Sequence, residues 1–157
     1  MNAIAVENHQ RTFADLGKLL GIEDLAFNAA GICVMGFDET IFRFEYQAER
    51  GEILASSIVG RLPEDAPAQV PWDVLMMNAA SLANGAGSVG IDPHTSNLVW
   101  FDRTLAKWLT VDGLQAWIKT GLARHEFWQS MLPQMVMVRS DEQSLQIHMT
   151  EELIFRA

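Results

Sequence analysis

The chain has 157 residues, of which 49% are apolar and 20% are charged, so it can fold as one domain around a hydrophobic core. Twenty acidic against 11 basic side chains give a net charge of −9, which disfavours binding to nucleic acid or anionic lipid. No apolar run reaches the roughly 20 residues of a membrane helix, and the N-terminus lacks a signal-peptide pattern. Cys33 is the only cysteine, so no internal disulfide can form, and a cytoplasmic location is expected.

The first predicted element is a short amphipathic helix. Apolar residues recur at helical spacing from Phe13 to Leu20, and Gly21 stands where a helix would end. Thr12 is the expected cap at its start.

Three antiparallel strands are predicted next, near residues 30–37, 41–48 and 52–60. Around Phe42 and Phe44 the residues alternate with the period of two that is typical of a half-buried strand. Short polar breaks between the runs predict tight hairpins. Pro63, Pro67 and Pro71 then indicate a loop.

A second helix is predicted after Pro71 and should end at Asn84-Gly85. A short strand, a turn at 92–94 and a strand at 97–103 follow. A closing helix of about 19 residues should begin near Val111, with one face bearing Leu114, Trp117, Ile118, Leu122, His125 and Trp128.

This order of elements predicts an α+β fold, in which an antiparallel twisted sheet is flanked by helices. The order is helix, three strands, helix, two strands and helix. We expect residues 1–132 to form one domain and residues 133–157 to be a C-terminal extension, in which the runs "MVMVR" and "SLQIHM" alternate weakly.

The stretch from Gly85 to Gly90 matches the G-x-G-x-x-G dinucleotide fingerprint. The fingerprint binds pyrophosphate only when a strand leads into it and a helix opens from it. Here a predicted helix precedes the glycines, and Pro93 prevents a helix from starting after them. The glycines are therefore interpreted as a helix end and a turn.

No pattern in the sequence indicates catalysis or a resident metal or cofactor. The four histidines share no ligand spacing with one another or with acidic residues, and no nucleophile motif is present. His125 is interpreted as a core or interface histidine. Cys33 is interpreted as inert packing in an apolar strand.

The ordered set of segments resembles the small acidic chaperones of bacterial type III secretion, a Tir-chaperone-like family. The resemblance spans roughly residues 12–132. It is carried by four stretches: "LGKLLGIEDLAFNAAGICVMGFDE", "ILASSIVGRLPED", "LMMNAASLANGAGSVGIDPHTSNLVWFD" and "LQAWIKTGLARHEFWQSML".

The resemblance implies a cytoplasmic homodimer that uses no ATP and performs no catalysis. It holds the N-terminal segment of one or more secreted effector proteins in non-globular form, through an added strand and apolar patches. Components of the secretion apparatus are further expected partners. By position, the expected effector-binding residues are Leu16, Leu19, Leu20, Ile32, Val34 and Phe42. The expected dimer-interface residues are Trp72, Leu75, Met76, Ala79, Leu82 and Trp100.

Several alternatives stay open at this point. The apolar stripe of the second helix could instead be an intramolecular core, and which face of the sheet is exposed is undetermined. Residues 133–157 could cover the sheet, extend the binding surface or contact the export machinery. A regulatory protein that sequesters a partner on the same fold and a small ligand-binding or enzymatic domain are the alternative functions.

Overall fold

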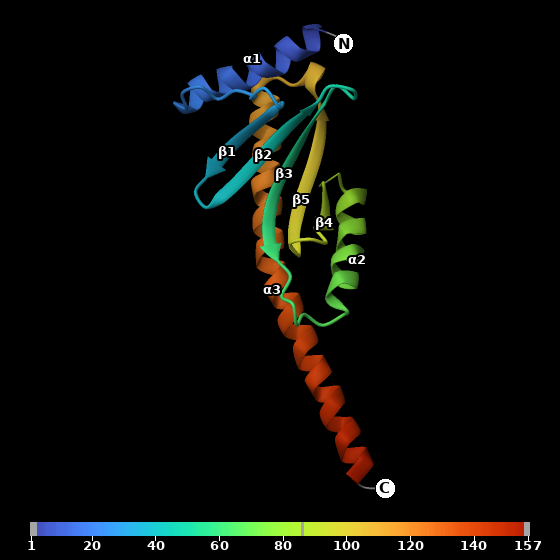
Figure 1. The fold of residues 1–157 in the computed structure, drawn as a ribbon. Coiled ribbons are helices and arrows are strands. Elements are labelled where there is room, and N and C mark those ends of the chain that lie inside the picture. Colours follow the sequence, from blue (N-terminus) through green and yellow to red (C-terminus); the bar gives the residue numbers. More distant parts are fainter. Residues whose placement is uncertain (1–2, 86, 156–157) are drawn as a thin grey trace.

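The described residues form a five-stranded antiparallel sheet, three α-helices and one short 3-10 helix (Figure 1). The computed structural model describes residues 3–85 and 87–155, with side chains from 8–85 and 87–143. The elements in chain order are α1 (Ala3–Leu20), β1 (Ile32–Phe37), β2 (Thr40–Gln47), β3 (Glu52–Arg61), α2 (Val70–Ala83), β4 (Ser88–Ile91), β5 (Asn97–Leu105), a short 3-10 helix (Ala106–Trp108) and α3 (Val111–Phe155). The predicted α+β fold and element order are confirmed.

The strands lie in the order β1-β2-β3-β5-β4, and every neighbouring pair is antiparallel. The hairpin between β1 and β2 turns at Asp38, which has a positive φ of 50°. A register shift between Ile58 and Gly60 interrupts the pairing of β3 with β5. β1 and β4 are therefore the two edges of the sheet.

One face of the sheet is covered, because α3 runs across it and α1 lies over its upper end (Figure 1). Phe42, Phe44 and Trp100 point from the strands into this core and are almost fully buried. Gly121 of α3 permits the close approach, since a Cβ there would lie 2.9 Å from the Phe42 ring and 3.0 Å from that of Trp100. The core therefore lies between the sheet and the two helices.

The first helix starts earlier than predicted, at Ala3, so Thr12 lies inside α1 and is not its cap. The Thr12 hydroxyl is 2.9 Å from the carbonyl oxygen of Asn8 and 3.1 Å from that of Leu109. Upstream, the His9 ring stacks on Tyr46 at 3.9 Å. Tertiary contacts therefore stabilise the part of α1 before Phe13, where the apolar spacing that predicted the helix had not yet begun.

The prediction for the C-terminal residues was also incomplete, because α3 continues to Phe155 and passes through Pro133. The alternating runs after Pro133 form helix and not strands. Leu132 is buried, and Met135 and Val136 pack against the core, which places apolar residues at helical spacing on both sides of the proline. Packing therefore offsets the one hydrogen bond that a proline removes from a helix interior.

Gly85 and Gly87 lie between the end of α2 and the start of β4, and Gly90 lies within β4; Ala86 is outside the described residues. This order of helix before strand is the reverse of a dinucleotide-binding turn. Gly87 has a φ of 75°, and a Cβ there would lie 2.7 Å from Nε1 of Trp100. The glycines therefore serve the turn and the core.

Candidate functional site

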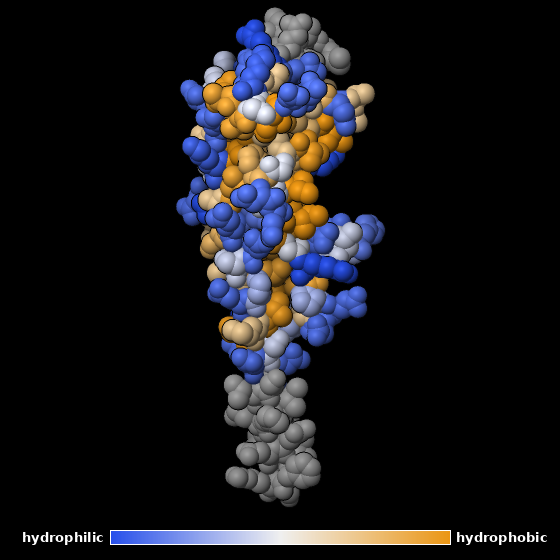
Figure 2. Space-filling model, turned by 90° about the vertical axis from the view of Figure 1, so that its left-hand side faces the viewer, coloured by the Kyte–Doolittle hydropathy of each residue, from blue (hydrophilic) through white to orange (hydrophobic). Residues whose placement is uncertain are grey.

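The sheet face opposite α3 carries an exposed aliphatic surface. Val34, Ile41 and Ile58 come from three successive strands and are 57%, 64% and 58% exposed. With Val99 and several polar neighbours they line a hollow of about 420 Å³. We call Val34, Ile41, Ile58 and Val99 the open face. Seen from the β1 side, apolar side chains gather over the upper half of the molecule, beside a hollow in its outline (Figure 2).

Register explains why these side chains share one face. Cys33 pairs with Phe44, and Met35 pairs with Phe42, so all four point into the core. Val34 on β1 and Ile41 on β2 therefore point to the opposite face, because successive side chains of a strand alternate between faces.

The two edges of the sheet differ in how they are closed. At β4, the side-chain oxygen of Asn78 on α2 accepts a hydrogen bond from the backbone N–H of Val89 at 2.8 Å. At β1, the side chain of Asn28 accepts one from the N–H of Ile32 at 3.0 Å. Beyond Ile32, β1 has no strand on its outer side within the described chain. This edge can therefore pair with an added strand.

The predicted effector-binding residues are divided by the structure between surface and core. Leu19 and Leu20, near the end of α1, and Val34 are exposed, and Ile32 is half-buried. Leu16 and Phe42 are the corrections, because both are buried in the protomer. Leu16 lies one turn after Phe13 on the buried side of α1, and Phe42 packs on Trp100 at 5.8 Å between ring centroids.

Helix α2 turns most of its apolar residues outward. Trp72, Leu75, Met76 and Leu82 are between 55% and 69% exposed, and Ala79 is exposed beside them. We call these five residues the α2 stripe; within the protomer they are not the intramolecular core that the sequence left open. Trp100 is a further correction, because it is 1% exposed and belongs to the core.

Several surface residues were missed by the sequence reasoning. Ile41 and Ile58 belong to the open face, and the alternation of their strands could have found them once Phe42 was placed inside. A groove between α2 and α3 was also missed, since it joins residues more than 50 positions apart. Its apolar lining is Met76, Met77, Met131, Met135 and Val138, and we call it the methionine groove.

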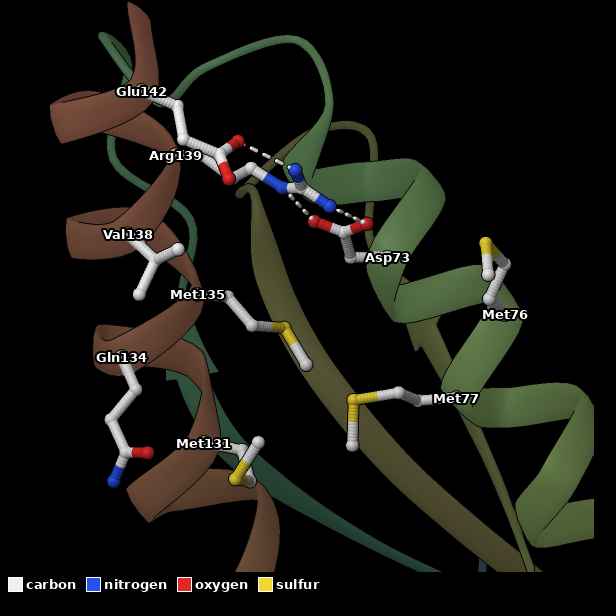
Figure 3. A pocket seen from close by; sticks show the side chains of 9 residues that line it. All are labelled: Asp73, Met76, Met77, Met131, Gln134, Met135, Val138, Arg139 and Glu142. Atoms are coloured by element: carbon white, nitrogen blue, oxygen red, sulfur yellow. Dashed lines mark hydrogen bonds and ion pairs between the residues drawn. The ribbon is translucent and has the colours of Figure 1, made fainter. Parts of the chain in front are cut away.

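The methionine groove has a volume of about 410 Å³ and ends at an ion pair (Figure 3). Arg139 donates two hydrogen bonds to Asp73, at 2.7 and 2.9 Å, and a third to Glu142 at 2.6 Å. The hydrogen bond from Arg139 is the main cause that lowers the pKa of Asp73 below its usual range. One guanidinium thus bridges two carboxylates at this end of the groove.

The core buries two kinds of side chain that are reactive in other proteins: a hydrogen-bonded serine–histidine pair and a cysteine thiol. Oγ of Ser57 and Nδ1 of His125 lie 2.8 Å apart, and burial lowers the pKa of His125 although nearby Glu126 opposes this. Burial raises the pKa of the Cys33 thiol to about 11, so it stays protonated at neutral pH. Within the described residues, no group of three or more His, Cys, Asp or Glu side chains could hold a metal ion. No helix in that part of the chain is both long and apolar enough to span a membrane.

Comparison with solved structures shows a shared fold. A chain of the HopA1–SchA chaperone–effector complex superposes with a TM-score of 0.68 at 18% identity, covering 80% of this chain and 97% of that one. A chain of the ExsC–ExsE complex superposes with a TM-score of 0.72 at 22% identity, covering 84% of this chain and 97% of that one. The structure of the Yersinia pestis type III secretion chaperone SycH with a fragment of YscM2 gives a TM-score of 0.60 at 16% identity. That match covers 76% of this chain and 98% of the other. No curated protein matches the sequence.

The family comparison covers the elements described above. The model of the Tir chaperone protein (CesT) family matches residues 11–129, from α1 through the sheet and α2 into α3. The match spans well over half of the chain. The chain therefore belongs to the Tir chaperone protein (CesT) family, the type III secretion chaperones that its sequence resembles.

Proposed function

We propose that this chaperone holds the N-terminal segment of an effector in extended form along β1 and over the open face. The observation that carries the proposal is the meeting of an unpaired edge strand with an exposed aliphatic face on the same hairpin. The similar fold in a chaperone–effector complex supports it.

The two features supply complementary interactions. The six residues of β1 extend over about 20 Å. The N–H and C=O groups of Ile32 bond with Asn28, and the outward groups of the later β1 residues can pair with any extended backbone. Alternate side chains of the added strand would then face the hollow between Val34, Ile41 and Ile58. Leu19 and Leu20 offer further apolar surface on α1. A client bound in this way needs no tertiary structure, so it stays ready for export through a narrow channel.

The chaperone acts as a homodimer under this proposal, with the α2 stripe as the interface. Only Val70 and Val74 of α2 are buried in the protomer, so one face of the helix leaves large apolar side chains in water. A two-fold partner would cover the same stripe on both copies. The net charge of −9 on each chain would help to keep the dimer soluble.

Holding and release need no catalytic group in this scheme, and we propose no ATP, cofactor or metal for them. We place the chaperone in the cytoplasm, where effectors are loaded before export and where Cys33 stays reduced. Docking to the secretion apparatus would follow once the client is bound.

A capture experiment tests client binding. The tagged chaperone is incubated with lysate of its own organism, captured proteins are identified, and the N-terminal segment of each is made as a recombinant probe. Ile41→Asp and Ile58→Asp should weaken binding of that segment at least 100-fold, because a carboxylate in an apolar contact costs several kcal/mol. Hydrogen exchange of the β1 amides should slow when the segment binds.

Met137→Asp is the matched control, since Met137 is 61% exposed on α3 and lies outside the open face. It adds the same charge and should leave client affinity unchanged. Wild-type affinity in both open-face variants, or β1 amides that exchange equally fast with and without client, would contradict the proposal.

A further inference from the structure

The end of α3 provides surface beyond the family fold. The family model stops at residue 129, and the similar structures cover 97% or 98% of their own chains but only 76% to 84% of this one. α3 continues to Phe155, and we call residues 133–155 the C-terminal arm. Figure 1 shows the arm extending well past the sheet.

The arm and α2 are fixed against each other by the ion pair of Arg139 with Asp73. The side chains of Arg139 and Asp73 are each at least two-thirds buried, and the guanidinium donates a hydrogen bond to each carboxylate oxygen of Asp73. A two-point contact of this kind holds a defined geometry. The arm therefore presents a preformed surface, which lowers the cost of ordering it on association.

The methionine groove is continuous with the α2 stripe. Met76 belongs to both, and it stands on the outer side of α2 in Figure 3. Met77, Met131 and Met135 converge between the two helices in the same view. One apolar surface thus runs from the stripe of α2 across the groove to Val138 on the arm.

The small surface area of the α2 stripe indicates that a dimer interface must include the neighbouring methionine groove. A helix of 14 residues is about 21 Å long, so one face of it offers a few hundred Å². A stable protein–protein interface buries about 800 Å² per partner. A dimer built on the α2 stripe therefore needs adjoining apolar surface, and the methionine groove adjoins it directly.

We infer that the second copy of the chain covers the methionine groove and the arm at Val138, so that the arm is part of the homodimer interface. This inference rests on the proposed homodimer. Each arm contact occurs twice because the interface is two-fold symmetric. Flexible methionine side chains fit a partner surface of irregular shape.

The test is the dimer dissociation constant of the full chain, measured by analytical ultracentrifugation. Val138→Asp should weaken the dimer at least tenfold, because it places a charge in the apolar contact of each copy. Met137→Asp is the matched control: the neighbouring residue is 61% exposed against 49% for Val138, and it does not line the groove. Circular dichroism must show equal helix content; if Val138→Asp loses helix, Val138→Gln carries the test.

Leu75→Asp separates this inference from the proposed homodimer. If Leu75→Asp dissociates the dimer while Val138→Asp matches wild type, the dimer stands and the arm inference is overturned. If wild type is monomeric at all concentrations, the homodimer itself fails. If Val138→Asp keeps the dimer but loses client binding, the groove serves clients and the inference is overturned.

Discussion

The same strands form both faces of the sheet, but one face is buried beneath α3 and the other is exposed to solvent. On the covered face Phe42, Phe44 and Trp100 pack beneath α3, and a glycine there brings the helix close. On the open face the intervening positions carry Val34, Ile41 and Ile58, which no part of the described chain covers. Large aromatic rings thus stabilise the protomer, while the aliphatic side chains opposite them remain available for a partner.

The largest expected difference between the faces is in stability, and β3 offers a matched pair of isoleucines. Ile53 is fully buried and Ile58 is 58% exposed. Ile53→Ala should lower the free energy of unfolding by about 2–5 kcal/mol, because it leaves a cavity. Ile58→Ala should change it by no more than about 0.5 kcal/mol. Urea unfolding measures both; equal losses would remove the distinction between the faces.

Two neighbouring serines on β3 give the next largest effect. Ser57 is buried and shares a hydrogen bond with His125, whereas the hydroxyl of Ser56 makes only a long 3.4 Å bond to the carbonyl oxygen of Arg43. Ser57→Ala should cost about 1–3 kcal/mol, since it leaves a buried ring nitrogen without its partner. Ser56→Ala should lie within about 0.5 kcal/mol of wild type in the same urea titration. A more damaging Ser56→Ala would mean that the open face is structural.

Sequence reasoning placed the strands well because their period-two pattern survives in the fold. It did not assign the faces. Val34 and Phe42 were both expected to bind effectors, yet the pairing of Met35 with Phe42 puts them on opposite sides of the sheet. Register depends on tertiary pairing, and a shift of one residue exchanges the faces.

The helices show the same limit in another form. The spacing of the α2 stripe predicted an amphipathic helix, but an apolar stripe looks alike whether it faces the core or the solvent. The closing helix was predicted to run for only about 19 residues from Val111, yet buried Leu132 and the contact of Arg139 with Asp73 continue α3 past Pro133. Those contacts join positions far apart in sequence, so no local pattern contained them. The dimer interface stays a prediction.

Acid should weaken the covered face more than the open one. Burial lowers the pKa of His125, so the folded state resists protonation of a ring that the unfolded chain protonates near pH 6.5. Stability is therefore full above about pH 6.5 and falls as pH drops below it, by at most about 1.4 kcal/mol at pH 5.5. Thermal unfolding at pH 7.5 and 5.5 measures the loss.

His125→Asn is the control for this pH dependence, because it keeps a hydrogen-bonding side chain that does not titrate. Its unfolding temperature should differ less between the two pH values than that of wild type. An identical difference in both proteins would assign the pH dependence to other groups.

The smallest expected effect is a gain on the open side. Gly36 lies on β1 with Val34, has no positive φ, and a Cβ there would meet nothing within 4 Å. Gly36→Ala should therefore raise stability by about 0.4–1 kcal/mol, since it restricts only the unfolded chain. Gly121→Ala, its counterpart beneath the covered face, should gain less or lose stability because the added methyl meets Phe42 and Trp100. A loss in Gly36→Ala would show that something already lies over β1, and the open face would then need another explanation.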